Sequence, residues 1–208
     1  KGKPSYIPKE VEFIKGDVRN KKDWTKVLKG VSYVFHLAAY MDYHPDFSRY
    51  FDINTRSIAY LFELILEKKL SIKKVILASS QSLYGEGKYL CRRHGIIYPS
   101  ARPEEQLKKH DWGVRCPYDG SLMKSLPELE DDQLMPQIPY GISKLAAEKL
   151  LLALGRIYSI PVVALRYSIV QGSRQSFRHF YSGALRDFSV RALAKLPIVM
   201  QEDAGQIR

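Results

Sequence analysis

Short apolar runs alternate along the chain with longer segments in which apolar residues recur every three or four positions. The short runs predict strands at residues 11–15, 33–39, 74–79 and 160–165, and the second and third are typical of strands buried in a parallel sheet. Helical spacing follows Asn20 or Asp23, runs from Pro45 to Lys69, and begins again at Pro139. This alternation predicts an α/β fold with a doubly wound, Rossmann-like parallel sheet and right-handed crossovers.

Polar or small residues follow each predicted strand. In order along the chain these are Asp17, then Ala38 and Ala39, then Ser79 and Ser80, and finally Arg166, Tyr167 and Ser168. In open α/β sheets, ligands bind beyond the carboxyl ends of the strands. We therefore expect all four strand ends to face one binding crevice.

Composition narrows the class of protein. The 208 residues are 45% hydrophobic, so the chain can bury a sizeable core, and one domain with an insertion is expected rather than two domains. No run of about 18 apolar residues indicates a membrane span, and the first four residues lack the apolar segment of a signal peptide. Two cysteines in a chain of this length are typical of a reducing compartment. We predict a cytoplasmic protein.

A formal net charge of +11 raises the question of nucleic-acid binding. The basic pairs are scattered along the chain, mostly near predicted helix ends, where cations are favourable. No helix carries the basic stripe on one face that nucleic-acid binding requires. The charge favours a solvated surface and remains compatible with a site for an anionic ligand such as a nucleotide sugar.

Tyr140 and Lys144 are the first candidates for chemistry. Residues four apart lie on one face of a helix, and Pro139 followed by strong helix formers predicts a helix here. An ammonium beside a phenol favours the phenolate, so we expect Lys144 to lower the pKa of Tyr140 and make it a general base. Taken alone the spacing is weak, because a packed tyrosine beside a solvated lysine has the same pattern.

Six motifs in order make the pattern specific: GDVRN at 16–20, HLAA at 36–39, Asn54-Thr55, SSQSLYG at 79–85, YGISK at 140–144 and LRYSIVQGSRQ at 165–175. The set resembles the extended short-chain dehydrogenase/reductases. Within that superfamily it is similar to the NAD-dependent nucleotide-sugar epimerases and dehydratases, including the group that acts on dTDP-L-rhamnose. The resemblance implies NAD as cofactor, a nucleotide sugar as substrate and a homodimer that pairs through the helix after Pro45 and the helix of Tyr140.

The resemblance also assigns roles to residues. The implied catalytic residues are Ser80, Tyr140 and Lys144. The implied cofactor contacts are Asp17, Val18, Leu37, Ala38, Ala39, Asn54, Ser79, Tyr140, Lys144 and Tyr167, and the implied substrate contacts are Ser80, Gln81, Ser82 and Arg174. His36 is interpreted as a core histidine, since neutral histidine is tolerated inside proteins.

The resemblance implies a reaction as well. Tyr140 removes a proton from a sugar hydroxyl while NAD takes the hydride, and return of the hydride to the other face of the ketone inverts one stereocentre. Gln81 and Ser82 stand where the dehydratases carry an Asp-Glu pair, so elimination of water lacks its acid and base. Two alternatives stay open: a non-catalytic nucleotide-binding or interaction module of the same fold, and a hydroxysteroid-type dehydrogenase.

Residues 86–137 depart from the sheet pattern and are polar and proline-rich, so we expect a long functional or disordered loop. The loop contains Cys91-x-x-His94 and Cys116-x-x-Asp119, spacings that suit tetrahedral zinc, although aspartate is an unusual fourth ligand. A similar insertion occurs in some bacterial nucleotide-deoxysugar 4-epimerases. The alternatives are a degenerate structural zinc site and two unrelated thiols.

Family members also open with a strand, a glycine-rich turn and a helix that receives the cofactor's pyrophosphate. No residues before Gly16 match that unit. We therefore expect residues 1–208 to be a partial NAD-binding domain with the start of a substrate-binding part, lacking two strands and a C-terminal portion, from a protein of roughly 300 or more residues.

Overall fold

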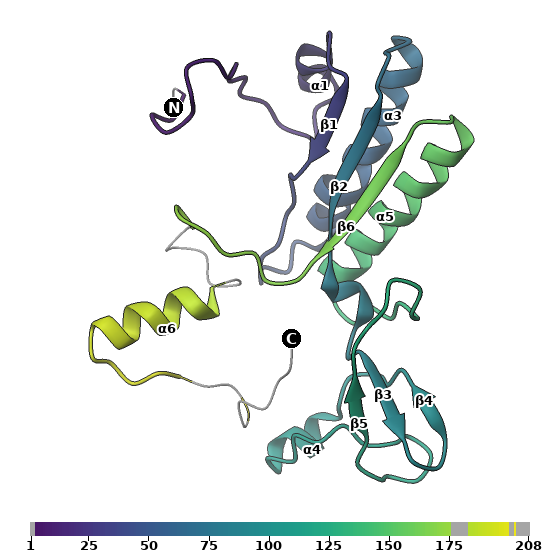
Figure 1. The fold of residues 1–208 in the computed structure, drawn as a ribbon, viewed down its shortest axis with the longest axis vertical. Coiled ribbons are helices and arrows are strands. Elements are labelled where there is room, and N and C mark those ends of the chain that lie inside the picture. The colour runs from purple at the N-terminus through teal and green to yellow at the C-terminus, as the bar shows by residue number, and fades with distance from the viewer. Residues whose placement is uncertain (1–2, 176–182, 200–201, 203–208) are drawn as a thin grey trace. The chain divides into compact units, whose positions relative to one another are not determined.

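The computed structural model describes residues 3–175, 183–199 and 202. The chain divides into two compact units. The first unit combines residues 1–40, 46–78 and 146–164, and the second combines residues 41–45, 79–145 and 165–208. Figure 1 shows the elements of each unit.

A three-stranded sheet organises the first unit, and two of its strands continue into the second. Its strands are β1 (Tyr33–His36), β2 (Lys74–Ser80) and β6 (Val162–Tyr167), in the order β1-β2-β6. β1 and β2 are parallel, with Val34 opposite Val75 and His36 opposite Leu77. The predicted α/β fold class with a parallel sheet is confirmed.

Helices cover one face of this sheet. They are α1 (Lys21–Val27), the segment α2 (Phe47–Tyr50), π-helical η1 (Phe51–Thr55) and α3 (Arg56–Glu67), and α5 (Pro139–Ile157). The core combines apolar side chains of α3 and the sheet with Ala147 and Leu151 of α5; Figure 1 shows α3 and α5 running along the strands. Asn20 caps α1 by accepting a hydrogen bond from the Lys22 N–H. It is one of the two residues at which the sequence predicted this helix to begin.

One strand prediction was wrong, and a second was wrong in part. Residues 11–15 form no strand, and Val11, Phe13 and Ile14 are exposed, because a strand requires a hydrogen-bonded neighbour and none of the described residues provides one. β1 is buried on one face only: Tyr33 and Phe35 are 56% and 66% exposed, whereas Val34 and His36 are buried. No described element covers the outer face of β1, so its apolar run does not mean burial on both sides.

The predicted loop at residues 86–137 was wrong as well, because it contains a second sheet. Strands β3 (Lys88–Cys91), β4 (Gly95–Ile97) and β5 (Lys124–Leu126) are antiparallel in the order β4-β3-β5, and α4 (Glu104–Lys108) lies between β4 and β5 in sequence. The strands are three or four residues long, too short for their apolar pattern to stand out. We call residues 86–137 the insertion.

The second unit also contains the 3₁₀-helix η2 (Gln81–Tyr84) directly after β2, and α6 (Ala184–Leu193). In the part of the chain that the structure describes, no helix combines the length and the apolar character needed to span a membrane.

Candidate functional site

Ser80 ends β2 and begins η2. Its backbone is extended, with φ −154° and ψ 149°, and its side chain caps η2 by accepting a hydrogen bond from the Ser82 N–H at 3.1 Å. The Ser82 hydroxyl donates to Ser80 Oγ at 2.9 Å. Both lone pairs of Ser80 Oγ are thus engaged, and its proton remains for a third partner.

That third partner is Tyr140, at the start of α5. Tyr140 and Ser80 share a side-chain hydrogen bond that lowers the pKa of the tyrosine. A hydrogen bond that lowers the tyrosine pKa is one donated to the phenol oxygen. The Ser80 hydroxyl has its proton available for this bond, because its oxygen already accepts two hydrogen bonds from Ser82. The structure therefore brings Ser80 and Tyr140 together.

The expected direction of the Tyr140 pKa was wrong. Burial raises the pKa of Tyr140 more than the Ser80 hydrogen bond lowers it, whereas the sequence predicted a lowering by the Lys144 ammonium. The physical reason is the burial of the phenol itself, which disfavours the charged phenolate. Lys144 is buried as well, and burial lowers its own pKa to about 8. In this structure the phenol is held protonated.

Lys144 lies one helical turn after Tyr140 and is only 2% exposed. None of the residues that the structure describes accepts a hydrogen bond from its ammonium group or forms an ion pair with it. A buried charge without a partner is costly. Such a group fits a ligand that brings hydroxyl oxygens, as the ribose of a nicotinamide cofactor does.

Gly141 is a positioning residue that the motif contained but that sequence reasoning did not single out. A Cβ at this position would lie 2.8 Å from the Ser82 carbonyl oxygen and 2.9 Å from the Pro136 side chain. Only glycine lets the first turn of α5 approach the η2 turn this closely. The close approach is what brings Tyr140 to Ser80.

Arg166 and Tyr84 form a second polar contact that sequence reasoning missed. The Arg166 guanidinium donates to Tyr84 Oη at 2.8 Å and to the Glu130 carbonyl oxygen at 2.7 Å, and it also lies over the Tyr84 ring. These contacts join the end of β6 to η2 and to the end of the insertion. The available signal was Tyr84 in the SSQSLYG motif.

The remaining predicted residues of the second unit differ in exposure. Gln81 and Ser82 are half-buried in η2, Ser79 is buried in β2, and Tyr167 and Arg174 are exposed. Of the predicted substrate contacts, the structure brings Ser80 and Ser82 into direct contact.

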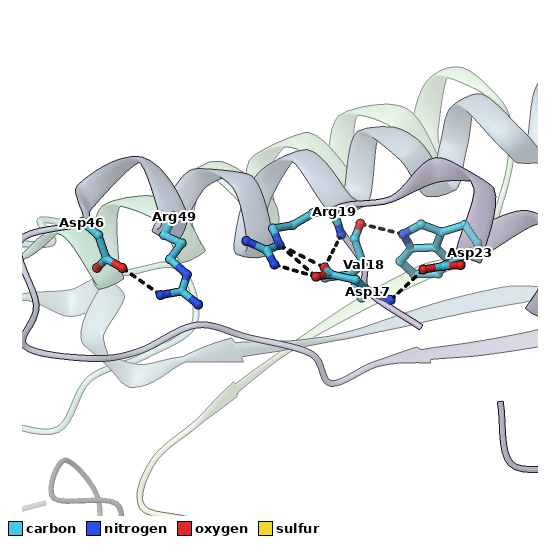
Figure 2. A network of polar contacts seen from close by, with 7 residues as sticks. Asp17, Val18, Arg19, Asp23, Asp46 and Arg49 are labelled. Carbon is cyan, nitrogen blue, oxygen red and sulfur yellow. Dashed lines mark hydrogen bonds and ion pairs between the residues drawn. The ribbon is translucent and has the colours of Figure 1, made fainter. Parts of the chain in front are cut away.

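Asp17 and Val18, expected at the cofactor's adenine, belong to the first unit. Both carboxylate oxygens of Asp17 accept from the Arg19 guanidinium, at 2.6 to 3.1 Å, as Figure 2 shows. These bonds, with one from the Arg19 N–H, hold the pKa of Asp17 at about 2. The Val18 carbonyl accepts from Trp24 Nε1 at 2.9 Å, so this turn is fixed by its own contacts.

Asn54 links the helix to the segment that follows β1. It is buried in η1, accepts from the Tyr40 N–H at 2.7 Å and donates to the Tyr40 carbonyl at 3.1 Å. The preceding residues, Leu37, Ala38 and Ala39, are exposed. Asn54 thus fixes the backbone directly after the exposed alanines, and short π-helical segments such as η1 are frequent at functional sites.

His36 is a packed core histidine, as the sequence indicated. It is buried in β1, its Nε2 lies 2.9 Å from Ser57 Oγ, and its ring stacks on Trp24 with centroids 5.6 Å apart.

A second cluster lies in the insertion, where Cys91, His94, Cys116 and Asp119 converge. One ligand atom of each lies within 4.8 Å of the others. Burial alone would raise the pKa of the Cys91 thiol, but backbone N–H groups of Arg93 and His94, with Ser121 and the His94 side chain, lower it to about 6. Burial raises the pKa of Cys116. The two thiols are buried and are not joined in a disulfide.

The chain is similar to several known proteins. A model of the NAD-binding family described as "Male sterility protein" matches residues 4–199. The dTDP-L-rhamnose 4-epimerase of Burkholderia thailandensis is 28% identical over 99% of this chain and 57% of its own length. A putative UDP-glucose 4-epimerase of Methanocaldococcus jannaschii is 28% identical over 100% of this chain and 57% of its own length.

Among solved structures, the UDP-glucuronic acid 4-epimerase of Bacillus cereus in complex with NAD superposes with a TM-score of 0.63. It is 27% identical, and the match covers 91% of this chain and 48% of that one. The chain therefore spans about half the length of the relatives it matches.

Proposed function

This chain belongs to the NAD-binding family described as "Male sterility protein", within the extended short-chain dehydrogenase/reductases, and from this premise we propose that the protein epimerises a nucleotide-diphosphate sugar with NAD as cofactor. The observation that carries the proposal is the Ser80 hydroxyl bonded to the Tyr140 phenol, one helical turn from a buried lysine that has no partner among the described residues. Related proteins with 4-epimerase activity on nucleotide sugars support the choice of substrate class.

The chain's own residues supply proton transfer and binding. Once its own proton has passed to solvent and the retained charge of Lys144 stabilises the phenolate, Tyr140 takes the proton of a sugar hydroxyl and later returns it. Ser80 can turn its proton from Tyr140 to the substrate oxygen, so that it follows the charge that develops there. Bound NAD supplies a hydride acceptor that gives the hydride back to the same carbon.

Lys144 would raise the reactivity of Tyr140 only when its charge is retained. With a pKa near 8 the ammonium is mostly protonated at neutral pH, and ribose hydroxyls of NAD would stabilise that charge. The residues that we propose contact NAD are Asp17, Val18, Leu37, Ala38, Ala39, Asn54, Ser79, Tyr140, Lys144 and Tyr167. Those proposed for the substrate are Ser80, Gln81, Ser82 and Arg174.

Replacing Tyr140 with phenylalanine tests the proposal. The full-length protein is incubated with NAD and a panel of nucleotide sugars, and epimers are followed by NMR. Tyr140→Phe should lower turnover by about 10³-fold or more, since it removes the proton acceptor, while NAD affinity stays within a few-fold.

Tyr118→Phe is the matched control, because Tyr118 is exposed on the insertion and should keep full turnover. Undiminished turnover in Tyr140→Phe would rule out the proposed base. NADH accumulating in proportion to added substrate would instead identify a dehydrogenase, and a protein that binds nucleotide without turnover would be a binding module.

We also propose that the protein is a homodimer. Apolar side chains on the helices of the first unit support this, since Leu66 of α3 and Leu152 and Ile157 of α5 are exposed. Sedimentation equilibrium of the full-length protein should give twice the chain mass, and Leu152→Glu should shift the equilibrium toward the monomer. A monomeric wild-type protein would overturn this assembly.

A further inference from the structure

Two turns of the insertion have the same construction. Each begins with a buried cysteine, Cys91 or Cys116, and places a polar residue three positions later, His94 or Asp119. Each then continues with a glycine in the left-handed region, Gly95 at φ +74° and Gly120 at φ +70°. The glycines let both turns reverse tightly, so that the third residue after each cysteine points back toward the sulfur.

Both turns also direct backbone N–H groups at their sulfur atoms. Cys91 Sγ accepts from the N–H groups of Arg93 and His94, and Cys116 Sγ accepts from those of Tyr118 and Asp119. Each turn thus fixes its own sulfur, and both sulfurs lie beside His94 Nδ1.

His94 holds the two turns together at one ring nitrogen. Its Nδ1 lies 3.4 Å from Cys91 Sγ, 3.3 Å from Cys116 Sγ and 3.7 Å from Asp119 Oδ2. A single ring nitrogen offers either one N–H or one lone pair, so it cannot form a full hydrogen bond with each of these three atoms. Ligands about 2.0 to 2.3 Å from a tetrahedral Zn²⁺ are roughly 3.3 to 3.8 Å from one another, which matches these separations.

The Asp119 carboxylate is oriented for a ligand role. Its Oδ1 accepts from the Ser121 N–H at 3.0 Å and from the Ser121 hydroxyl at 2.7 Å, which leaves Oδ2 directed toward His94. In metal sites, hydrogen bonds from neighbouring groups that do not bind the ion commonly hold the ligands in orientation. Ser121 Oγ also lies 3.6 Å from Cys91 Sγ.

The apolar core of the insertion is too small to explain its fold. Its buried cluster contains only Cys91, Ile97, Cys116 and Met123 among the described residues. Small folds with so little core are commonly stabilised by disulfides or metal ions, and the two cysteines are free.

We propose that the insertion binds one Zn²⁺ through Cys91 Sγ, His94 Nδ1, Cys116 Sγ and the Asp119 carboxylate. Two thiolates, an imidazole and a carboxylate form a donor set that suits Zn²⁺. All four positions are protein ligands, so the ion is structural: it joins the β3–β4 turn to the turn that precedes β5. The ion takes no part in the sugar chemistry proposed above.

Metal analysis tests the proposal directly. The full-length protein, produced with Zn²⁺ in the medium and dialysed against metal-free buffer, should retain one zinc per chain by mass spectrometry of the elements. Replacement by Co²⁺ should produce thiolate-to-cobalt charge-transfer absorption and the visible bands of a tetrahedral site. Zinc far below one per chain, or a Cys91–Cys116 disulfide detected by a mass two hydrogens lower, would overturn the site.

Variants at position 119 keep the test independent of folding defects. Asp119→Cys completes a Cys₃His set and should raise Zn²⁺ affinity by at least about tenfold, while Asp119→Asn should lower it by at least about tenfold. Both are measured by competition with a chromophoric chelator. The Asp119→Cys protein should also show stronger thiolate-to-cobalt absorption than wild type.

Matched controls lie elsewhere in the second unit. Asp131→Asn and His44→Ala change exposed residues of the same types and should leave zinc content and affinity unchanged, whereas His94→Ala should abolish retention. Equal affinity in Asp119→Cys, Asp119→Asn and wild type would exclude the carboxylate from the site. Tyr140→Phe should retain full zinc content, which separates failure of this site from failure of the epimerase proposal.

Discussion

Lys88 and Lys144 are both largely withdrawn from solvent in the second unit, yet their surroundings differ. Lys88, in the insertion, bonds the Asp132 carboxylate at 2.8 Å, and this hydrogen bond raises the lysine pKa. Lys144, in α5, has no partner among the described residues, and burial lowers its pKa to about 8. One ammonium is stabilised by the fold, and the other destabilises it.

The difference separates a charge that the chain itself satisfies from one that we propose to be functional. Asp132 also accepts from the Tyr98 hydroxyl and the Leu129 N–H, so Lys88 completes a network that needs nothing from outside the chain. Lys144 lies one turn from Tyr140 and has no such partner among the described residues, so we propose that a ligand completes its contacts. Sites that bind a cofactor commonly retain such an unsatisfied group at the expense of stability.

Replacing each lysine with methionine should give opposite results, and this is the largest expected effect. Lys144→Met should lower kcat/KM of the full-length protein by about 100-fold or more, with an unchanged or higher midpoint of thermal unfolding. Lys88→Met should lower the midpoint, because Asp132 loses its counter-ion, and keep kcat/KM within a few-fold. Steady-state kinetics and thermal unfolding check both, and similar behaviour of the two variants would break the comparison.

The stability of the protein in alkaline solution should distinguish Lys144 from Lys88 further. Because the pKa of Lys144 falls from 10.5 to about 8 on folding, the unfolded chain binds more protons between these values, so stability rises with pH from about 8 to about 10.5. Urea unfolding should show wild type gaining up to about 3 kcal/mol relative to Lys144→Met over this range. Saturating NAD should reduce the gain, and parallel pH curves for the two proteins would contradict the assignment.

The contribution of the Lys88–Asp132 ion pair to stability should change in acid solution, and this is the smallest effect of these three predictions. The hydrogen bond from Lys88 holds the pKa of Asp132 at about 2, so its contribution is present above pH 3.8 and is lost as the pH falls through about 2. The stability advantage of wild type over Lys88→Met should shrink over this range. The change is small because Tyr98 and Leu129 still bond Asp132 in the variant, and an advantage independent of pH would exclude the pair as its source.

Sequence patterns predicted most elements of the first unit, since strands β1 and β2 and helices α3 and α5 carry long apolar or periodic segments. The segment at 11–15 has the same kind of pattern, yet forms no strand. A strand's pattern records which face can be buried, whereas its formation depends on a neighbour that the pattern does not specify. The prediction for the insertion was wrong for the opposite reason. Its strands are too short for their apolar pattern to be recognised in the sequence, and they form through antiparallel pairing.

The candidate site shows the same division. Spacing alone placed Tyr140 and Lys144 on one helical face and suggested ligands within each cysteine turn. It could not show that Ser80 donates to Tyr140, that Gly141 permits this approach, or that the two cysteine turns meet at His94 Nδ1.

What the amino-acid sequence determined by itself is local: helical neighbours four residues apart, apolar strands, tight turns at glycine, and a set of motifs that defines the family. Tertiary structure decided the environment of each group, and with it the direction in which the pKa values of Tyr140, Lys144 and Lys88 shift. Lys144 and Lys88 are the same chemical group. Lys88 has a carboxylate within hydrogen-bonding distance and supports the fold, whereas Lys144 has none among the described residues and is a candidate for binding a ligand.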